Sequence, residues 1–106
     1  MGVQILPECN NEEFDKLQSE GFHPASMSYS SWVATLGFFG VCIMPGEEIY
    51  GDCMPDVFLE NANQARLAAR RVGNQGYDWN ASLVRVEDTI KVATIAKALG
   101  KCIVWL

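Results

Sequence analysis

A stretch of thirteen residues without a charge, Trp32 to Met44, constrains the fold of this chain more than any other part of the sequence. Between Gly21 and Gly46 the chain has no acidic residue and no basic residue except His23. Such a segment is poorly suited to water, so we expect it to form the core. A membrane span fits less well, because thirteen helical residues cover about 20 Å and a span needs roughly 20 residues.

Two local structures compete for this stretch, and its periodicity does not separate them. A helix beginning at Ser30 or Ser31 would have a plausible N-cap, but Gly37 and Gly40 would each weaken a helix interior by about 1 kcal/mol. Beta-branched and aromatic residues dominate the stretch, and the Pro-Gly pair that follows it is typical of a turn. We therefore predict extended structure that bends near the glycines.

The N-terminal part of the chain predicts a short strand and then a helix. Residues 3–6 form the strand, which Pro7 ends. Asn10 and Glu13 have the spacing of a capping box for a helix over residues 11–20, and Gly21 is a suitable residue to end it.

The middle of the chain predicts an edge strand, a loop and a second helix. We expect the strand at residues 48–50, a turn-rich loop at 51–56, and a strand or a turn at 57–59. Asn61 is a suitable cap for a helix that runs through Val72 and ends at Gly73. The alanines of this helix share one face, which predicts close packing against a sheet.

The C-terminal part predicts a strand, a helix and a final strand. Residues 83–86 form the first strand, Asp88 caps a helix through Leu99, and Gly100 ends it. Residues 102–106 are an apolar run, which predicts a strand in the interior of the sheet. The fold class is therefore a single α+β domain over residues 1–106, with a mixed or mainly antiparallel sheet of about four to five strands and three helices, in the order β-α-β-β-(β)-α-β-α-β.

The charges are divided unevenly between the two parts of the chain. Residues 1–60 hold ten acids and one base, whereas residues 61–106 hold three acids and seven bases. Either the acidic part attracts a basic partner, or the two parts pair within the fold. In the second case Arg66, Arg70 or Arg71 should lie within about 4 Å of acids at 11–20 or 47–56. The net charge of −5 argues against a nucleic-acid partner.

Few residues suggest catalysis or metal binding. The four cysteines contain no CxxC pair, and the chain has no phosphate-binding glycine motif. His23 is the single histidine, and with Cys53 it forms the weak catalytic candidate of the chain. We predict no metal and no cofactor, and we favour a protein that is not an enzyme.

The segment at residues 74–80 is the best candidate for a binding loop. It alternates polar turn residues with two large aromatic residues, which contribute contact area with few rotatable bonds. A small-ligand site there would use the residues of the loop, a nearby arginine and a tryptophan below them: Tyr77, Asp78, Trp79, Arg70 and Trp105.

The sequence alone does not establish a function. Our leading expectation is a non-enzymatic cytoplasmic interaction protein or inhibitor-type accessory protein that presents an acidic surface to a basic protein partner. The alternative is a small-ligand-binding module with its site at residues 74–80, and a cysteine-dependent enzyme ranks below both. The apolar segments predict a homodimer, and we expect neither a membrane nor a nucleic acid among the partners.

Overall fold

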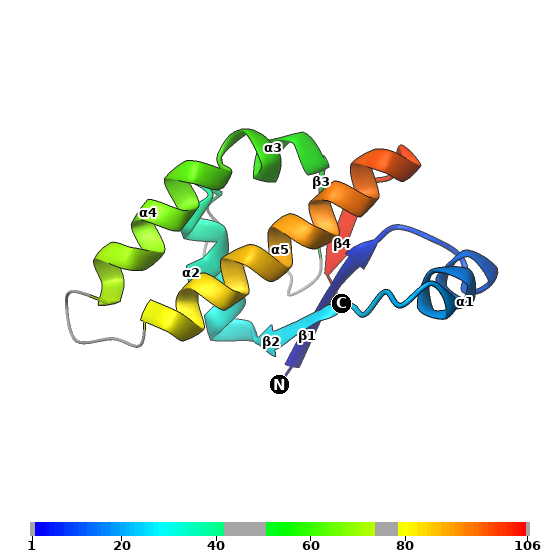
Figure 1. The fold of residues 1–106 in the computed structure, drawn as a ribbon, viewed down its shortest axis with the longest axis horizontal. Coiled ribbons are helices and arrows are strands. Elements are labelled where there is room, and N and C mark those ends of the chain that lie inside the picture. The colour runs from blue at the N-terminus through cyan, green and yellow to red at the C-terminus, as the bar shows by residue number, and fades with distance from the viewer. Residues whose placement is uncertain (1, 42–50, 74–78, 106) are drawn as a thin grey trace.

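A four-stranded sheet and a long helix that crosses it organise the fold (Figure 1). The computed structural model describes residues 2–41, 51–73 and 79–105, with the backbone alone at 51–53, 73, 79 and 80. In chain order the elements are β1 (Gly2–Pro7), α1 (Asn11–Ser19), β2 (Ala25–Ser28), α2 (Tyr29–Phe38), β3 (Gly51–Cys53), α3 (Pro55–Glu60), α4 (Ala62–Gly73), α5 (Trp79–Leu99) and β4 (Ile103–Trp105).

The sheet is antiparallel, and its strand order is β2-β1-β4-β3. Ile5 is the centre of one row across it, since it pairs with Ala25 on one side and Trp105 on the other. Because successive side chains of a strand point to opposite faces, one face carries the buried residues of β1 and β4. These residues are Val3, Ile5, Pro7, Ile103 and Trp105.

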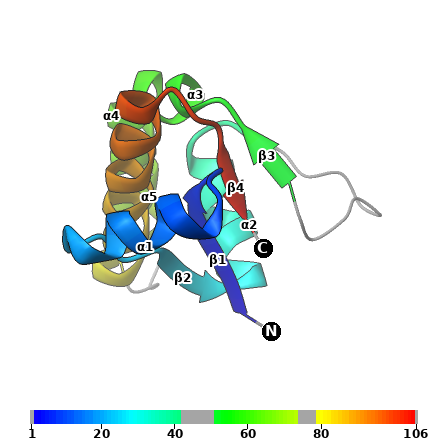
Figure 2. The same ribbon diagram turned by 90° about the vertical axis from the view of Figure 1, so that its right-hand side faces the viewer.

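The helices α3, α4 and α5 lie on one side of the sheet, and α1 lies at the opposite end of the molecule from α4 (Figures 1 and 2). Among the described residues, four aromatic rings meet in the core, from α2, its C-cap residue Phe39, α3 and β4. The centroid of Trp32 on α2 is 5.4 Å from that of Trp105 and 6.3 Å from that of Phe58, which lies 5.1 Å from Phe39. The prediction that residues 32–44 contribute to the core is confirmed for Trp32, Leu36 and Phe39, which are at most 1% exposed.

The predicted N-terminal strand and first helix are confirmed. The side chain of Asn10 accepts a hydrogen bond from the backbone N–H of Glu13 at 2.9 Å, and the Glu13 carboxylate accepts one from the Asn10 N–H at 3.2 Å. This is the predicted capping box. Gly21 follows the helix with φ +93°, and the next residue, Phe22, donates its N–H to the Leu17 carbonyl at 3.0 Å.

The prediction of extended structure at residues 32–44 is wrong for residues 32–38, which belong to the helix α2 (Tyr29–Phe38). Residues 42–44 lie outside the described residues. The Ser28 side chain caps it by accepting from the Ser31 N–H at 3.2 Å. Gly40 has φ +80° and lies just beyond the helix, where the Val41 N–H donates to the Leu36 carbonyl at 2.9 Å. Gly40 therefore ends the helix and does not interrupt it. Of the two glycines that argued against a helix, only Gly37 lies in its interior.

Two predictions for the middle of the chain are also wrong. Gly51–Cys53 is the strand β3 and Pro55–Glu60 the helix α3, where we expected one loop and then a strand or turn. Proline is favoured in the first turn of a helix because its missing N–H has no partner there. The edge strand expected at residues 48–50 lies outside the described residues.

The predicted alanine helix exists as α4 and ends at Gly73 as expected. Ala65 and Ala69 are fully buried, but α4 packs against α5 and α2 and not on the sheet. The Asn61 side chain does not act as its N-cap in the expected way. It donates to the Val57 carbonyl at 2.8 Å, one turn earlier.

The strand expected at residues 83–86 and the helix start expected at Asp88 are both wrong, because α5 runs from Trp79 to Leu99. Its buried residues recur three or four positions apart, which is the spacing of one helix face. They include Ser82, Val86, Thr89, Ala93 and Ala96. The predicted end is confirmed, because Gly100 has φ +67° and Lys101 donates its N–H to the Ala96 carbonyl at 2.9 Å.

The architecture is therefore a compact α+β domain, as predicted, with a different number and order of elements. The last strand, β4, lies inside the sheet between β1 and β3, as expected. No helix within the described ranges has the length and apolar character that crossing a membrane requires.

Candidate functional site

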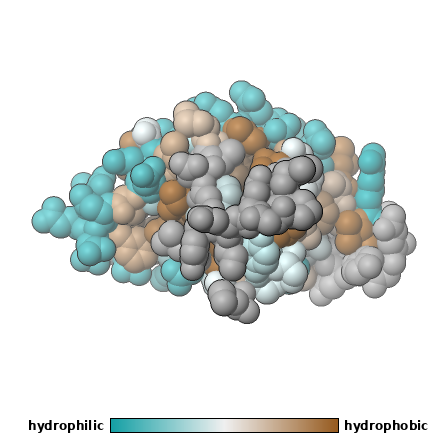
Figure 3. Space-filling model, turned by 180° about the vertical axis from the view of Figure 1, so that it is seen from behind, coloured by the Kyte–Doolittle hydropathy of each residue, from teal (hydrophilic) through white to brown (hydrophobic). Residues whose placement is uncertain are grey.

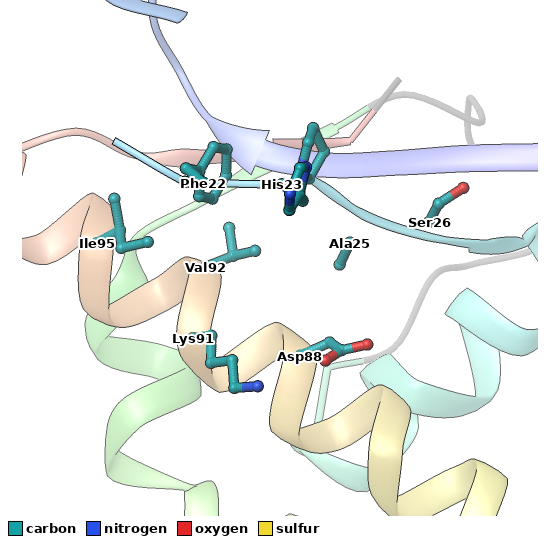
Figure 4. Close-up of a pocket in the computed structure, with 10 residues that line it drawn as sticks. Phe22, His23, Ala25, Ser26, Asp88, Lys91, Val92 and Ile95 are labelled. Atoms are coloured by element: carbon teal, nitrogen blue, oxygen red, sulfur yellow. The ribbon is translucent and has the colours of Figure 1, made fainter. Parts of the chain in front are cut away.

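A groove between α5 and the connection from α1 to β2 is the best-formed candidate site. It consists of two cavities of about 350 and 370 Å³, which share Gly21, Phe22 and Ile95. The first continues along α5 to Asp88, and the second continues to Leu99. Figure 4 shows the first cavity, with Phe22 and His23 above it and the side chains of α5 below.

The floor of the groove is apolar. Leu17 and Phe22 reach it because the glycine turn at the end of α1 reverses the chain and brings the two side chains to one side. On α5, Val92 is buried, Ile95 is half-buried, and Leu99 remains 45% exposed. Part of the apolar face of α5 is therefore open to the surface.

Charged side chains lie around this apolar floor. Glu20 lines the cavity near Leu99, while His23, Asp88 and Lys91 line the other cavity. None of these four groups forms an ion pair with another described residue. The groove thus offers apolar contact along its length and unpaired charges at both ends.

The surface around α1 is strongly acidic. Four exposed carboxylates lie there with no ion pair among the described residues, and we call this group the acidic end; it consists of Glu8, Glu12, Asp15 and Glu20. The single base of α1 is Lys16. Figure 3 shows hydrophilic residues gathered at the end of the molecule that α1 forms.

The charge division is only partly neutralised within the fold. Among the acids of residues 1–60 whose side chains the structure describes, two form ion pairs with lysines, Asp56 with Lys97 at 2.7 Å and Glu13 with Lys101 at 3.6 Å. The expectation that arginines make these pairs is wrong for the described carboxylates. Arg66 instead binds Glu87 of α5 through two hydrogen bonds, of 2.5 and 3.2 Å.

The pair of Arg66 and Glu87 gives a pH-dependent prediction. The hydrogen bonds from Arg66 hold the pKa of Glu87 below its ordinary value, with a smaller opposing effect of burial. A lowered pKa stabilises the fold above the ordinary pKa of the group, and this contribution is lost as the pH falls through the lowered value. Since the Glu87 side chain is 40% exposed, we expect Glu87→Gln to reduce the free energy of unfolding at pH 7 by about 0.2–1 kcal/mol.

Urea unfolding at pH 7 and in strong acid measures this effect. The difference between Glu87→Gln and the wild-type protein should shrink as Glu87 becomes protonated. In an Arg66→Gln background, adding Glu87→Gln should change little at either pH. An undiminished difference in acid would show that the pair does not stabilise through its charge.

The residues predicted for the binding loop are not brought together within the described part of the chain. Tyr77 and Asp78 lie outside the described residues, and so does the side chain of Trp79, whose backbone begins α5. Arg70 is exposed on α4. Trp105 is 6% exposed and packs edge-on against Trp32 in the core.

The catalytic candidates His23 and Cys53 lie near opposite edges of the sheet. His23 is exposed two residues before β2, whereas Cys53 belongs to β3. Three strand spacings separate these edges, which is about 14 Å. The described part of the chain also gathers no group of three or more His, Cys, Asp or Glu side chains that could hold a metal.

The Cys9 thiol is not activated either. Burial raises its pKa, Glu13 raises it further, and Lys101 opposes these effects only in part. A raised pKa keeps a thiol protonated and less nucleophilic. Cys9 is therefore a weak candidate for a nucleophile.

The sequence did not identify the groove, although one signal for it was present. The last helix was predicted to run to Leu99, and a helix end was predicted at Gly21; both residues line the groove. The sequence did not indicate that α5 packs with this side facing the turn at Gly21, and that packing forms the groove.

No protein-family model, no curated protein and no solved structure matches the chain, so its function has to be inferred from this geometry.

Proposed function

We propose that this chain is a non-enzymatic interaction protein of the cytoplasm, which binds a basic protein partner through the acidic end and the adjoining groove. The observation that carries the proposal is the placement of four unpaired carboxylates around α1, next to an apolar groove that α1 helps to form. Complementary charge accelerates encounter and selects partners, while apolar contact holds the complex.

The position of Glu20 joins these two features. It belongs to the acidic end and also lines the groove with Leu17 and Leu99. A partner segment with apolar side chains on one face and lysine or arginine beside them would place the former on Ile95 and Leu99 and the latter near Glu20. Helical ligands use this arrangement, with anchors three or four residues apart.

Neutralising the acidic end should slow association. We expect the triple variant Glu12→Gln, Asp15→Asn, Glu20→Gln to bind a fluorescent amphipathic Leu-Lys helical peptide with an association rate lower by about tenfold or more at low salt. Stopped-flow fluorescence measures this rate. The single variant Glu20→Gln should have a larger effect than Glu60→Gln, which removes one exposed and unpaired charge from α3.

Salt dependence provides the second readout. Raising the ionic strength should slow binding of the wild-type protein and leave the triple variant nearly unchanged, because exposed charges are screened over about 10 Å at 0.1 M salt. Equal association rates for the wild-type protein and the triple variant would remove the proposal. A peptide with Glu in place of Lys is the control for purely apolar binding.

A homodimer belongs to the same proposal as a further expectation. Large apolar side chains that are about half exposed occur on α4 and α5 and at the start of α3, and self-association would cover some of them. They are Met54, Leu67, Val84 and Leu99.

A further inference from the structure

A third cavity, of about 690 Å³, lies between α2, the end of α4 and the start of α5. It is separate from the groove of the acidic end, with which it shares no lining residue. Much of its wall is apolar, with Ala34 and Phe38 from α2 and Val72 from α4. Its volume is within the range of about 300–1,000 Å³ that small-molecule sites occupy.

The polar groups of this cavity include one cation and no described carboxylate. Arg85 lines the cavity, is half-buried, and forms no ion pair with a described acid. Two acidic residues follow Arg85 closely in α5, but Glu87 pairs with Arg66 and Asp88 lines the groove instead. An unpaired guanidinium in a concave site is suited to an anion, because its planar donors match a carboxylate or a phosphate.

Ser82 adds a hydroxyl to the wall of the cavity beside Arg85. It lines the cavity, is only 9% exposed, and its hydroxyl has no hydrogen bond to another described residue. Among the described residues, the fully buried polar side-chain atoms without a partner are the indole nitrogens of Trp32 and Trp105. The Ser82 hydroxyl is therefore open to the cavity, where a polar group of a ligand can replace water as its hydrogen-bond partner. Ser82 and Arg85 are three positions apart on α5, so they lie on one side of the helix.

The starts of two helices add to the positive potential. Both α2 and α5 begin beside the cavity, and neither has an acidic residue in its first turn. The N-terminal end of a helix carries a partial positive charge, which favours anions.

We propose that this cavity binds an amphipathic monocarboxylate, with its carboxylate at Arg85 and Ser82 and its hydrocarbon part against Ala34, Phe38 and Val72. A single guanidinium balances a single charge. A phosphate monoester carries about −1.5 to −2 at pH 7, and part of that charge would have no counterpart in the cavity. The inference does not depend on the acidic end. It places a small-ligand site at residues other than those of the loop at 74–80, where the sequence predicted one.

The test uses octanoate as the probe, with octanol and octyl phosphate as comparison ligands. We expect isothermal titration calorimetry to show saturable 1:1 binding of octanoate that is at least about tenfold tighter than binding of either comparison ligand, the ratio expected from one well-matched charged contact. In NMR titrations the shifted amide signals should belong to the residues that line the cavity, and those around the groove should remain in place.

Two variants keep the fold and remove the site. Arg85→Gln should weaken octanoate binding at least about tenfold, whereas Arg71→Gln, which removes an exposed arginine that does not line the cavity, should not. Gly37→Leu should block binding sterically. A Cβ at Gly37 meets nothing within 4 Å, and leucine is a better helix former than glycine, so this variant should fold at least as well as the wild-type protein.

The outcomes separate this inference from the broader idea of a ligand site. If octanol binds as tightly as octanoate, or if Arg85→Gln binds like the wild-type protein, the cavity is apolar and the carboxylate assignment is wrong. If octyl phosphate binds more tightly, the anion is a phosphate and the assignment is wrong as well. If no ligand binds up to about 10 mM, the cavity is not a ligand site of this kind. None of these results affects the salt-dependent binding expected at the acidic end.

Discussion

Replacing Trp32 with alanine should lower the free energy of unfolding by about 3–5 kcal/mol, the usual cost of truncating a fully buried aromatic side chain. Trp32 is 0% exposed, and its ring contacts Phe58 of α3 and Trp105 of β4. Alanine would leave a cavity where α2, α3 and the sheet meet. Because domains are stable by only about 5–15 kcal/mol, the loss should be visible as a large decrease in the urea midpoint.

Phenylalanine at the same position separates the contribution of ring packing from the cost of the unsatisfied indole N–H. The indole N–H of Trp32 is buried and has no hydrogen-bond partner among the described residues. Trp32→Phe removes this unsatisfied donor, which offsets part of the lost contact, so it should cost much less than Trp32→Ala. If both variants are destabilised equally, the ring does not carry the packing that we assign to it.

Replacing Ala69 with leucine should be destabilising for the opposite reason. Ala69 is fully buried on α4, which packs on α5 and α2, and its small side chain allows these helices to lie close together. Three additional carbon atoms must displace one of them, at a typical cost of about 1–3 kcal/mol. Thermal or urea unfolding measures the loss.

Ala98→Leu is the control for this substitution, since Ala98 is exposed on α5 and the chemical change is the same. It should alter the free energy of unfolding by no more than about 0.5 kcal/mol.

The spacing of α4 and α5 also shapes the third cavity, because Val72 and Arg85 line it from these two helices. Ala69→Leu should therefore weaken octanoate binding as well. If Ala69→Leu is as stable as the wild-type protein, the helices are not packed as closely at this position as we describe.

The capping signals of the sequence were reliable where the chemistry was local. The pair of Asn10 and Glu13, and the glycines at 21, 73 and 100, marked helix ends that the structure confirms. These signals act through hydrogen bonds or backbone freedom within a few residues, so they do not depend on the rest of the fold. The interior position of β4 was also predictable, from its uninterrupted apolar run.

The errors arose where burial overrides local preference. Glycines and beta-branched residues argued against helix at α2, but packing of Trp32 and Leu36 in the core outweighs a propensity difference of about 1 kcal/mol. In α5, the sequence Leu-Val-Arg-Val at 83–86 alternates as a strand would. The three- and four-residue spacing from Ser82 onward was the stronger signal, and it required a longer window to be recognised.

The candidate sites were less predictable than the fold. Glu20, Phe22 and Ile95 are ordinary residues in the sequence, and they become a groove only through the crossing of α5 over the sheet. Arg85 falls in the segment at 83–86 that we predicted to be a strand, and its place in a helix is what directs it to the third cavity. Both sites depend on which faces of distant segments meet, and this is tertiary information.

The pairing of β1 with β4 has a consequence for how the chain folds during synthesis. Ile5 pairs with Trp105, and about one hundred residues separate them, so this contact closes a loop almost as long as the chain. At about 5–20 residues per second, a ribosome needs roughly 5–20 s to deliver β4 after β1 has emerged. During that time β2 can cover one edge of β1, while the other edge remains an open template for incorrect strand pairing.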